Sequence, residues 1–142
     1  MNIEKLQEMW QTDCQIDTDE YGNASIIIPQ LHQRYMEYHN TFSLMKKEKE
    51  SDMRRLVKEK WIYYKGKAPS TIYKELPFDL KLTDKKEVEM FISADDDVIN
   101  LQLKIDYIEQ LLIFLDSILR QLSNRNYQIK NAIDWEKFKA GM

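Results

Sequence analysis

The chain has 142 residues, of which 43% are hydrophobic and 32% charged, and its net charge is −3 at pH 7. This composition indicates one folded domain and excludes a disordered chain. The longest apolar run, residues 111–115, is too short to cross a bilayer, so we expect no membrane span and no export signal. One cysteine and two histidines exclude a disulfide framework and a Cys/His zinc site, which predicts a cytoplasmic protein without a metal or other cofactor.

Helices are predicted for the first half of the chain. Residues 3–14 form a short helix, residues 16–25 read as a loop, and residues 29–64 form one long helix that Pro29 can open. The apolar stripe of the long helix fills its first half, so the second half is expected to be more exposed. That stripe comprises Leu31, Tyr35, Tyr38, Phe42 and Met45.

A connector follows at residues 66–93, where Gly66, Pro69 and Pro77 break the helical pattern. Its later part alternates weakly and predicts either a short β-hairpin around residues 83–86 or no regular structure. The fold class is therefore mainly α, with three regions. These are an N-terminal helical region at 1–67, a connector at 68–93 and a C-terminal helical region at 94–142.

A leucine-rich helix begins near Val98 and repeats apolar residues at alternating steps of three and four. A second stripe adjoins the first, so the helix is apolar on two sides. It is either a buried central helix or part of a self-associating bundle, and the shortage of apolar partners favours self-association. The predicted oligomerisation residues are Leu101, Ile105, Ile108, Leu112, Leu115, Leu119 and Leu122. A turn at residues 124–126 and a last short helix at 127–139, ending at Gly141, are expected to follow.

Basic residues are concentrated in one stretch of this acidic chain. Residues 46–67 carry nine basic and four acidic side chains, whereas both flanking parts have a net negative charge. This block indicates either a polyanion site or a solvated helix face with internal ion pairs. Within it, the segment at residues 57–69 interleaves lysines with aromatic rings, a pairing that suits the phosphates and bases of single-stranded nucleic acid. The alternative is that Trp61 and Tyr64 are core anchors and the lysines only solvate the surface.

No catalytic motif is present, so we do not expect an enzyme. Asp95, Asp96 and Asp97 could hold Mg²⁺ in a nuclease, but their place before the leucine-rich helix favours an N-cap with first-turn carboxylates. The second alternative to a nucleic-acid-binding function is a structural assembly protein, which forms a coiled coil and does not bind DNA.

The chain resembles the UvsY recombination mediator family of T-even-type bacteriophages over nearly its whole length. Three segments carry the resemblance: residues 29–35, residues 58–67, and residues 93–98 together with 124–141. The family's DNA-binding motif, LKARLDYYxG, aligns with residues 57–66, so its two basic residues correspond to Lys58 and Lys60. The residues predicted to bind DNA are Arg54, Arg55, Lys58, Lys60, Trp61, Tyr63, Tyr64, Lys65 and Lys67.

The resemblance implies a non-enzymatic protein that binds single-stranded DNA and forms a hexameric or heptameric homo-oligomeric ring. Its implied partners are a phage RecA-like recombinase and a phage single-strand-binding protein. Such a mediator loads the recombinase onto DNA coated by the single-strand-binding protein, in homologous recombination, repair and recombination-dependent replication. The implied location is the cytoplasm of the infected bacterial host.

Overall fold

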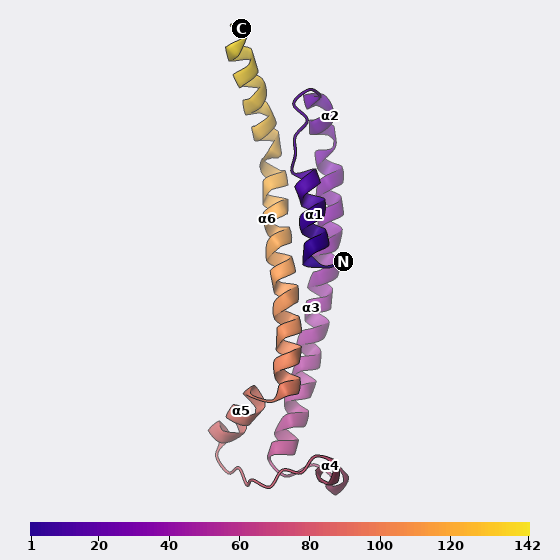
Figure 1. The fold of residues 1–142 in the computed structure, drawn as a ribbon, viewed down its shortest axis with the longest axis vertical. Coiled ribbons are helices and arrows are strands. Elements are labelled where there is room, and N and C mark those ends of the chain that lie inside the picture. Colours follow the sequence, from indigo (N-terminus) through magenta and orange to yellow (C-terminus); the bar gives the residue numbers. More distant parts are fainter. The chain divides into compact units, whose positions relative to one another are not determined.

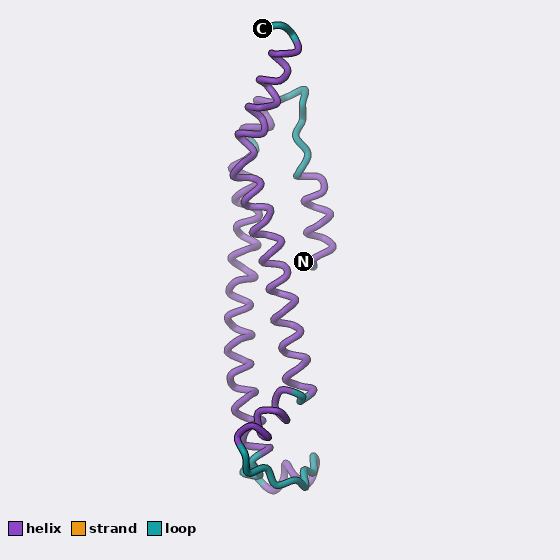
Figure 2. Tube along the Cα trace, turned by 90° about the vertical axis from the view of Figure 1, so that its left-hand side faces the viewer, coloured by secondary structure: helices purple, strands orange, loops and turns teal.

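The computed structural model describes residues 1–142 and contains six helices and no strand (Figure 2). The prediction of a mainly α fold is therefore confirmed. The helices are α1 Ile3–Asp13, α2 Tyr21–Ile26, α3 Ile28–Tyr64, α4 Ser70–Glu75, α5 Lys85–Ser93 and α6 Asp96–Lys139. None of them combines the length and the hydropathy that a membrane span requires.

The first and third helices match their predicted bounds to within one residue, but two short stretches were predicted wrongly. The expected loop at residues 16–25 contains all of α2 except its last residue, Ile26. The possible β-hairpin at residues 83–86 is instead the start of α5, because the Asp84 side chain accepts a hydrogen bond from the Lys86 N–H and caps that helix. Short helices of this kind have too few turns to show a helical period in the sequence.

Helix α6 runs without interruption from Asp96 to Lys139, so the predicted turn at residues 124–126 and the separate last helix are wrong. Arg125, in the middle of that expected turn, is only 4% exposed. Its Nη2 donates a 2.7 Å hydrogen bond to the backbone carbonyl of Asp13, and its guanidinium lies 5.5 Å from the Trp10 ring centroid. The predicted end of this helix at Gly141, which has a φ of +77°, is confirmed.

The chain divides into two compact units, of which the first comprises residues 1–43 and 109–142. Within it α1 lies beside the first part of α3 (Figure 1), and the Asp13 carboxylate accepts hydrogen bonds from Tyr35 at 2.7 Å and Arg34 at 3.1 Å. The core of this unit is apolar apart from Arg125. Its buried apolar residues are Leu6, Ile28, Leu31, Tyr35, Phe42, Leu111, Leu112, Leu115, Ile118, Leu122 and Ile129.

The second unit comprises residues 44–108 and contains the end of α3, the helices α4 and α5, and the start of α6. Val88 and Ile92, four residues apart on α5, form a small core with Val98 of α6. Partly buried side chains of α3 and the connector complete this core: Met53, Leu56, Tyr64 and Leu82. The packing places the basic end of α3 next to the first turn of α6.

Candidate nucleic-acid interface

Helix α3 ends in a Schellman-type cap at Gly66. Gly66 has a φ of +75°, in the left-handed region that favours glycine. The Lys67 N–H donates to the Ile62 carbonyl at 3.0 Å, and the Gly66 N–H donates to the Tyr63 carbonyl at 3.1 Å. The cap therefore turns the chain back on itself and brings Lys67 beside the last turns of the helix.

Four residues of α3 lie on one side of this helix because they recur at intervals of four, three and four: Arg54, Lys58, Trp61 and Lys65. Together with Lys67 they are called the basic face. The Trp61 side chain is 40% exposed, and its ring centroid lies 6.0 Å from the Lys65 Nζ and 5.1 Å from the Lys67 Nζ. Lys58 is exposed and forms no ion pair. The basic face thus presents free cations around an accessible aromatic ring.

The two arginines before the motif are also exposed. The Arg54 Nη2 donates to the Ser51 hydroxyl at 3.0 Å, and the Arg55 Nη1 lies 3.1 Å from the Asp52 carboxylate. An ion pair that is this exposed to solvent contributes little binding free energy. Both guanidinium groups therefore remain accessible to an anionic ligand.

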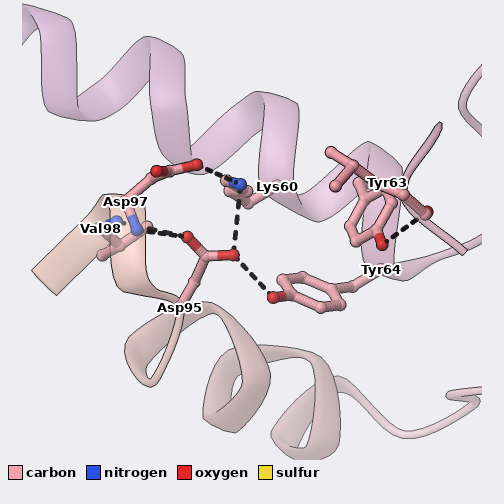
Figure 3. Close-up of polar contacts among 7 residues, drawn as sticks. Lys60, Tyr63, Tyr64, Asp95, Asp97 and Val98 are labelled. Carbon is pink, nitrogen blue, oxygen red and sulfur yellow. Dashed lines mark hydrogen bonds and ion pairs between the residues drawn. The ribbon is translucent and has the colours of Figure 1, made fainter. Parts of the chain in front are cut away.

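Lys60 lies apart from the basic face and is largely covered. Its side chain is 17% exposed, and its Nζ lies 3.2 Å from Asp95 Oδ2 and 2.8 Å from Asp97 Oδ2 (Figure 3). Burial alone would lower the pKa of Lys60, but the hydrogen bonds to Asp97 and Asp95 outweigh it, so this pKa is raised above its usual value. The second basic residue of the predicted motif is therefore already paired within the chain.

The two tyrosines of the motif are half-buried in an aromatic cluster. The Tyr63 ring stacks on Tyr73 with centroids 5.4 Å apart, and the Tyr64 ring packs edge-on against Phe78 at 5.0 Å. Phe91 of α5 completes the cluster, 5.6 Å from the Tyr64 ring. The Tyr63 hydroxyl donates to the Leu76 carbonyl at 2.9 Å. These ring contacts stabilise the unit. The alternative that Trp61 and Tyr64 are core anchors therefore holds for Tyr64, but it does not hold for Trp61, which is exposed.

Asp95 connects this cluster to the first turn of α6. Its Oδ1 accepts from the Asp97 N–H at 2.9 Å and the Val98 N–H at 3.3 Å, so the predicted N-cap is confirmed. Its Oδ2 accepts from the Tyr64 hydroxyl at 2.6 Å. Burial raises the pKa of this carboxyl, but hydrogen bonds from Tyr64, Lys60 and the Val98 N–H outweigh it, and the net pKa lies below its usual value.

A cavity of about 720 Å³ opens beside this network. Lys60 is the only cation in its lining, whereas Glu59, Asp95, Asp96 and Asp97 all contribute carboxylates. No group of acidic, histidine or cysteine side chains in the structure could hold a metal ion. The lining therefore carries a net negative charge, unlike the basic face. The pairing of Lys60 with carboxylates more than thirty residues away has no signal in the sequence.

The residues predicted for oligomerisation are mostly buried within the chain itself. Leu101 and Leu119 are half-buried, and the other five are at most 8% exposed. Within a single protomer, this burial agrees with the alternative in which the leucine-rich helix is a buried central helix. A contact between copies through these residues stays a prediction.

Other apolar residues of α6 are exposed, particularly near its C-terminal end. The Trp135 and Phe138 side chains are 58% and 72% exposed, and their rings stack on each other with centroids 5.6 Å apart. Tyr127 is 70% exposed. Aromatic surface of this extent is uncommon on a protein that has no partner.

Comparison with known proteins places this geometry in context. Residues 9–142 match the model of the family described as "Recombination, repair and ssDNA binding protein UvsY". The chain is 25% identical over 141 residues to the "Recombination protein uvsY" of Enterobacteria phage T4, with 99% of each protein covered. It also resembles two crystal structures of the bacteriophage T4 recombination mediator protein UvsY. The lattice type II structure has a TM-score of 0.85 at 24% identity and covers 99% of this chain and 98% of its own. The lattice type IV structure has a TM-score of 0.82 at 22% identity and covers 98% and 99%, respectively.

Proposed function

Because the chain belongs to the UvsY family of recombination, repair and ssDNA-binding proteins, we propose that it is a recombination mediator that binds single-stranded DNA through its basic face. The observation that carries this proposal is the exposed Trp61 ring, flanked by Lys65 and Lys67. Arg54 and Lys58 extend the same side of α3. Arg55, one position away, adds another accessible cation.

The chemistry of the basic face suits an unstacked strand. Ammonium and guanidinium groups attract phosphates, and each base that stacks on an aromatic ring contributes about 1 to 3 kcal/mol. None of these contacts distinguishes one base from another. Binding is therefore independent of sequence, as a protein that acts on any exposed single strand requires.

As a mediator the protein loads a phage RecA-like recombinase onto DNA coated by the phage single-strand-binding protein. It acts in recombination, repair and recombination-dependent replication, in the cytoplasm of the infected host. A hexameric or heptameric ring would present one basic face per subunit to the same strand, which raises the effective affinity without new contacts. The exposed aromatic residues at the end of α6, with Leu101 and Leu119, supply the contacts between copies.

A structural assembly protein without DNA binding is the second candidate. It is favoured by the internal pairing of Lys60 and by the partial burial of Tyr63 and Tyr64, which leave these three motif residues less accessible than the basic face. It leaves the basic face without a role.

Salt-dependent binding to fluorescent oligothymidylate distinguishes the two candidates. For a DNA-binding mediator, the logarithm of the binding constant falls with the logarithm of the salt concentration, by about 0.7 per phosphate neutralised. Replacing Lys58 and Lys67 by alanine should flatten this slope. The matched control replaces Lys81 and Lys86, two exposed lysines outside the basic face, and should leave the slope unchanged. Equal slopes for both double variants would reject the proposed site.

A further inference from the structure

Lys60 lies between two carboxylates that differ in how firmly they are held. The side chain of Asp95 is 9% exposed, and it is fixed by Tyr64 and by two backbone N–H groups as well as by Lys60. The side chain of Asp97 is 67% exposed, and its only hydrogen-bond partner is Lys60. The Asp95 carboxylate is therefore fixed by the fold, whereas the Asp97 carboxylate can move away from Lys60.

The place of Asp97 is one that a phosphate oxygen could take. An ammonium group binds carboxylate and phosphate oxygens through the same charge-assisted hydrogen bonds. The Asp97 carboxylate lies 2.8 Å from the Lys60 Nζ (Figure 3), and Asp97 is the more exposed of the two partners. An ion pair with one exposed partner is weak in water, so a polyanion that is already bound nearby can replace that partner.

We infer that Asp97 is an internal counter-anion that a DNA phosphate displaces to reach Lys60, while Asp95 stays in place and positions Lys60. This inference rests on the proposed function. Asp97 then lowers the affinity of each subunit for DNA, because it competes with the phosphate for Lys60. Tight binding therefore requires several subunits to bind the same strand.

The sharpest test compares Asp97→Asn with Asp96→Asn. Both substitutions remove one negative charge from the first turn of α6, but only Asp97 contacts Lys60. Changes in net charge and in the interaction with the helix dipole are therefore matched. Affinity for fluorescent oligothymidylate is measured at low salt by anisotropy. We expect Asp97→Asn to bind about two- to fivefold more tightly than Asp96→Asn, the range for losing one competing surface ion pair. Equal affinity, or weaker binding by Asp97→Asn, would overturn the inference.

A mutant cycle shows whether the effect passes through Lys60. In a Lys60→Ala background, Asp97→Asn and Asp96→Asn should bind equally. A difference that persists without Lys60 would contradict the proposed competition. Circular dichroism and thermal melting check that each variant is folded, and Asp97→Ser provides a second replacement for which the same result is expected.

The same titrations separate failure of this inference from failure of the proposed function. If replacing Lys58 and Lys67 weakens binding while Asp97→Asn and Asp96→Asn remain equal, only the inference fails. If the Lys58 and Lys67 double variant binds like the wild type, the proposed site fails. If the wild-type protein does not bind oligothymidylate at all, both fail.

Discussion

The Tyr64 hydroxyl donates a 2.6 Å hydrogen bond to the Asp95 carboxylate, which lies 31 residues further along the chain. Tyr64 is the last residue of α3, and Asp95 caps the first turn of α6. One carboxylate thus joins the end of the basic segment to the start of the leucine-rich helix. Two residues of the predicted DNA-binding motif, Lys60 and Tyr64, therefore contribute to the stability of the fold.

The first prediction concerns that stability. Asp95→Ala should lower the free energy of unfolding by about 2 kcal/mol, because it removes an N-cap and leaves the Tyr64 hydroxyl and the Lys60 ammonium without their partner. Tyr64→Phe removes one hydrogen bond and should cost about 1 kcal/mol. Urea unfolding monitored by circular dichroism measures both. The control is Asp96→Ala in the same helical turn, and an equal loss for Asp95→Ala and Asp96→Ala would contradict the role assigned to Asp95.

The second prediction follows from the lowered pKa of Asp95, whose ordinary value is 3.8. A carboxyl whose pKa is lower in the folded than in the unfolded state contributes stability above the unfolded value. That contribution is lost as the pH falls through the lower folded value. Asp95→Asn should therefore lose less stability on acidification than the wild type, as measured by melting temperature from pH 7 to pH 2. Asp79→Asn, at an exposed position, is the control; the same acid dependence in wild type and Asp95→Asn would refute the assignment.

The two long helices could be predicted from the sequence because their apolar residues recur with helical spacing over many turns. Leu31, Tyr35 and Phe42 are buried on α3, and Leu115 and Leu122 are buried on α6. The continuity of α6 through residues 124–126 was missed. Residues 124–126 are polar and resemble a turn. The helix continues through them in the structure, where Arg125 contacts Trp10 and Asp13 near the N-terminus. Local propensity is a weak guide where tertiary contacts decide.

The candidate site was predictable only in part. The spacing of Lys58, Trp61 and Lys65 indicates a shared helix side, and the structure leaves this side accessible. The separation of Lys60 from this side depends on Asp95 and Asp97, which no local pattern connects with it. Contacts between distant segments are set by packing, so a motif alone does not show which of its residues remain free.

The third prediction concerns Trp61. Trp61→Ala should weaken binding to oligothymidylate about 5- to 160-fold, because a stacked base contributes about 1 to 3 kcal/mol. Its ring is exposed, so the thermal stability should change little. Trp61→Phe keeps an aromatic surface and should recover much of the affinity. If alanine and phenylalanine at this position bind equally, stacking on this ring is not part of the interaction.

The fourth prediction concerns assembly. Replacing both Trp135 and Phe138 by alanine should lower the mass measured by light scattering while the helix content stays unchanged, because both side chains are exposed in the protomer. Leu115→Ala is the contrasting variant. Its side chain is fully buried, so it should cost about 2 to 5 kcal/mol of stability. An unchanged mass for the aromatic double variant would exclude the end of α6 as a contact between copies.

Ultraviolet cross-linking of the wild-type protein to oligothymidylate, followed by tryptic digestion and mass spectrometry, tests the central claim most directly. Trypsin cleaves after Lys60 and Lys65, so Trp61 is released in a short peptide of its own, residues 61–65. We predict that the DNA adduct lies on Trp61 in this peptide and disappears when Lys58 and Lys67 are both replaced by alanine. Adducts confined to other peptides, with residues 61–65 unmodified, would show that DNA does not bind at the basic face.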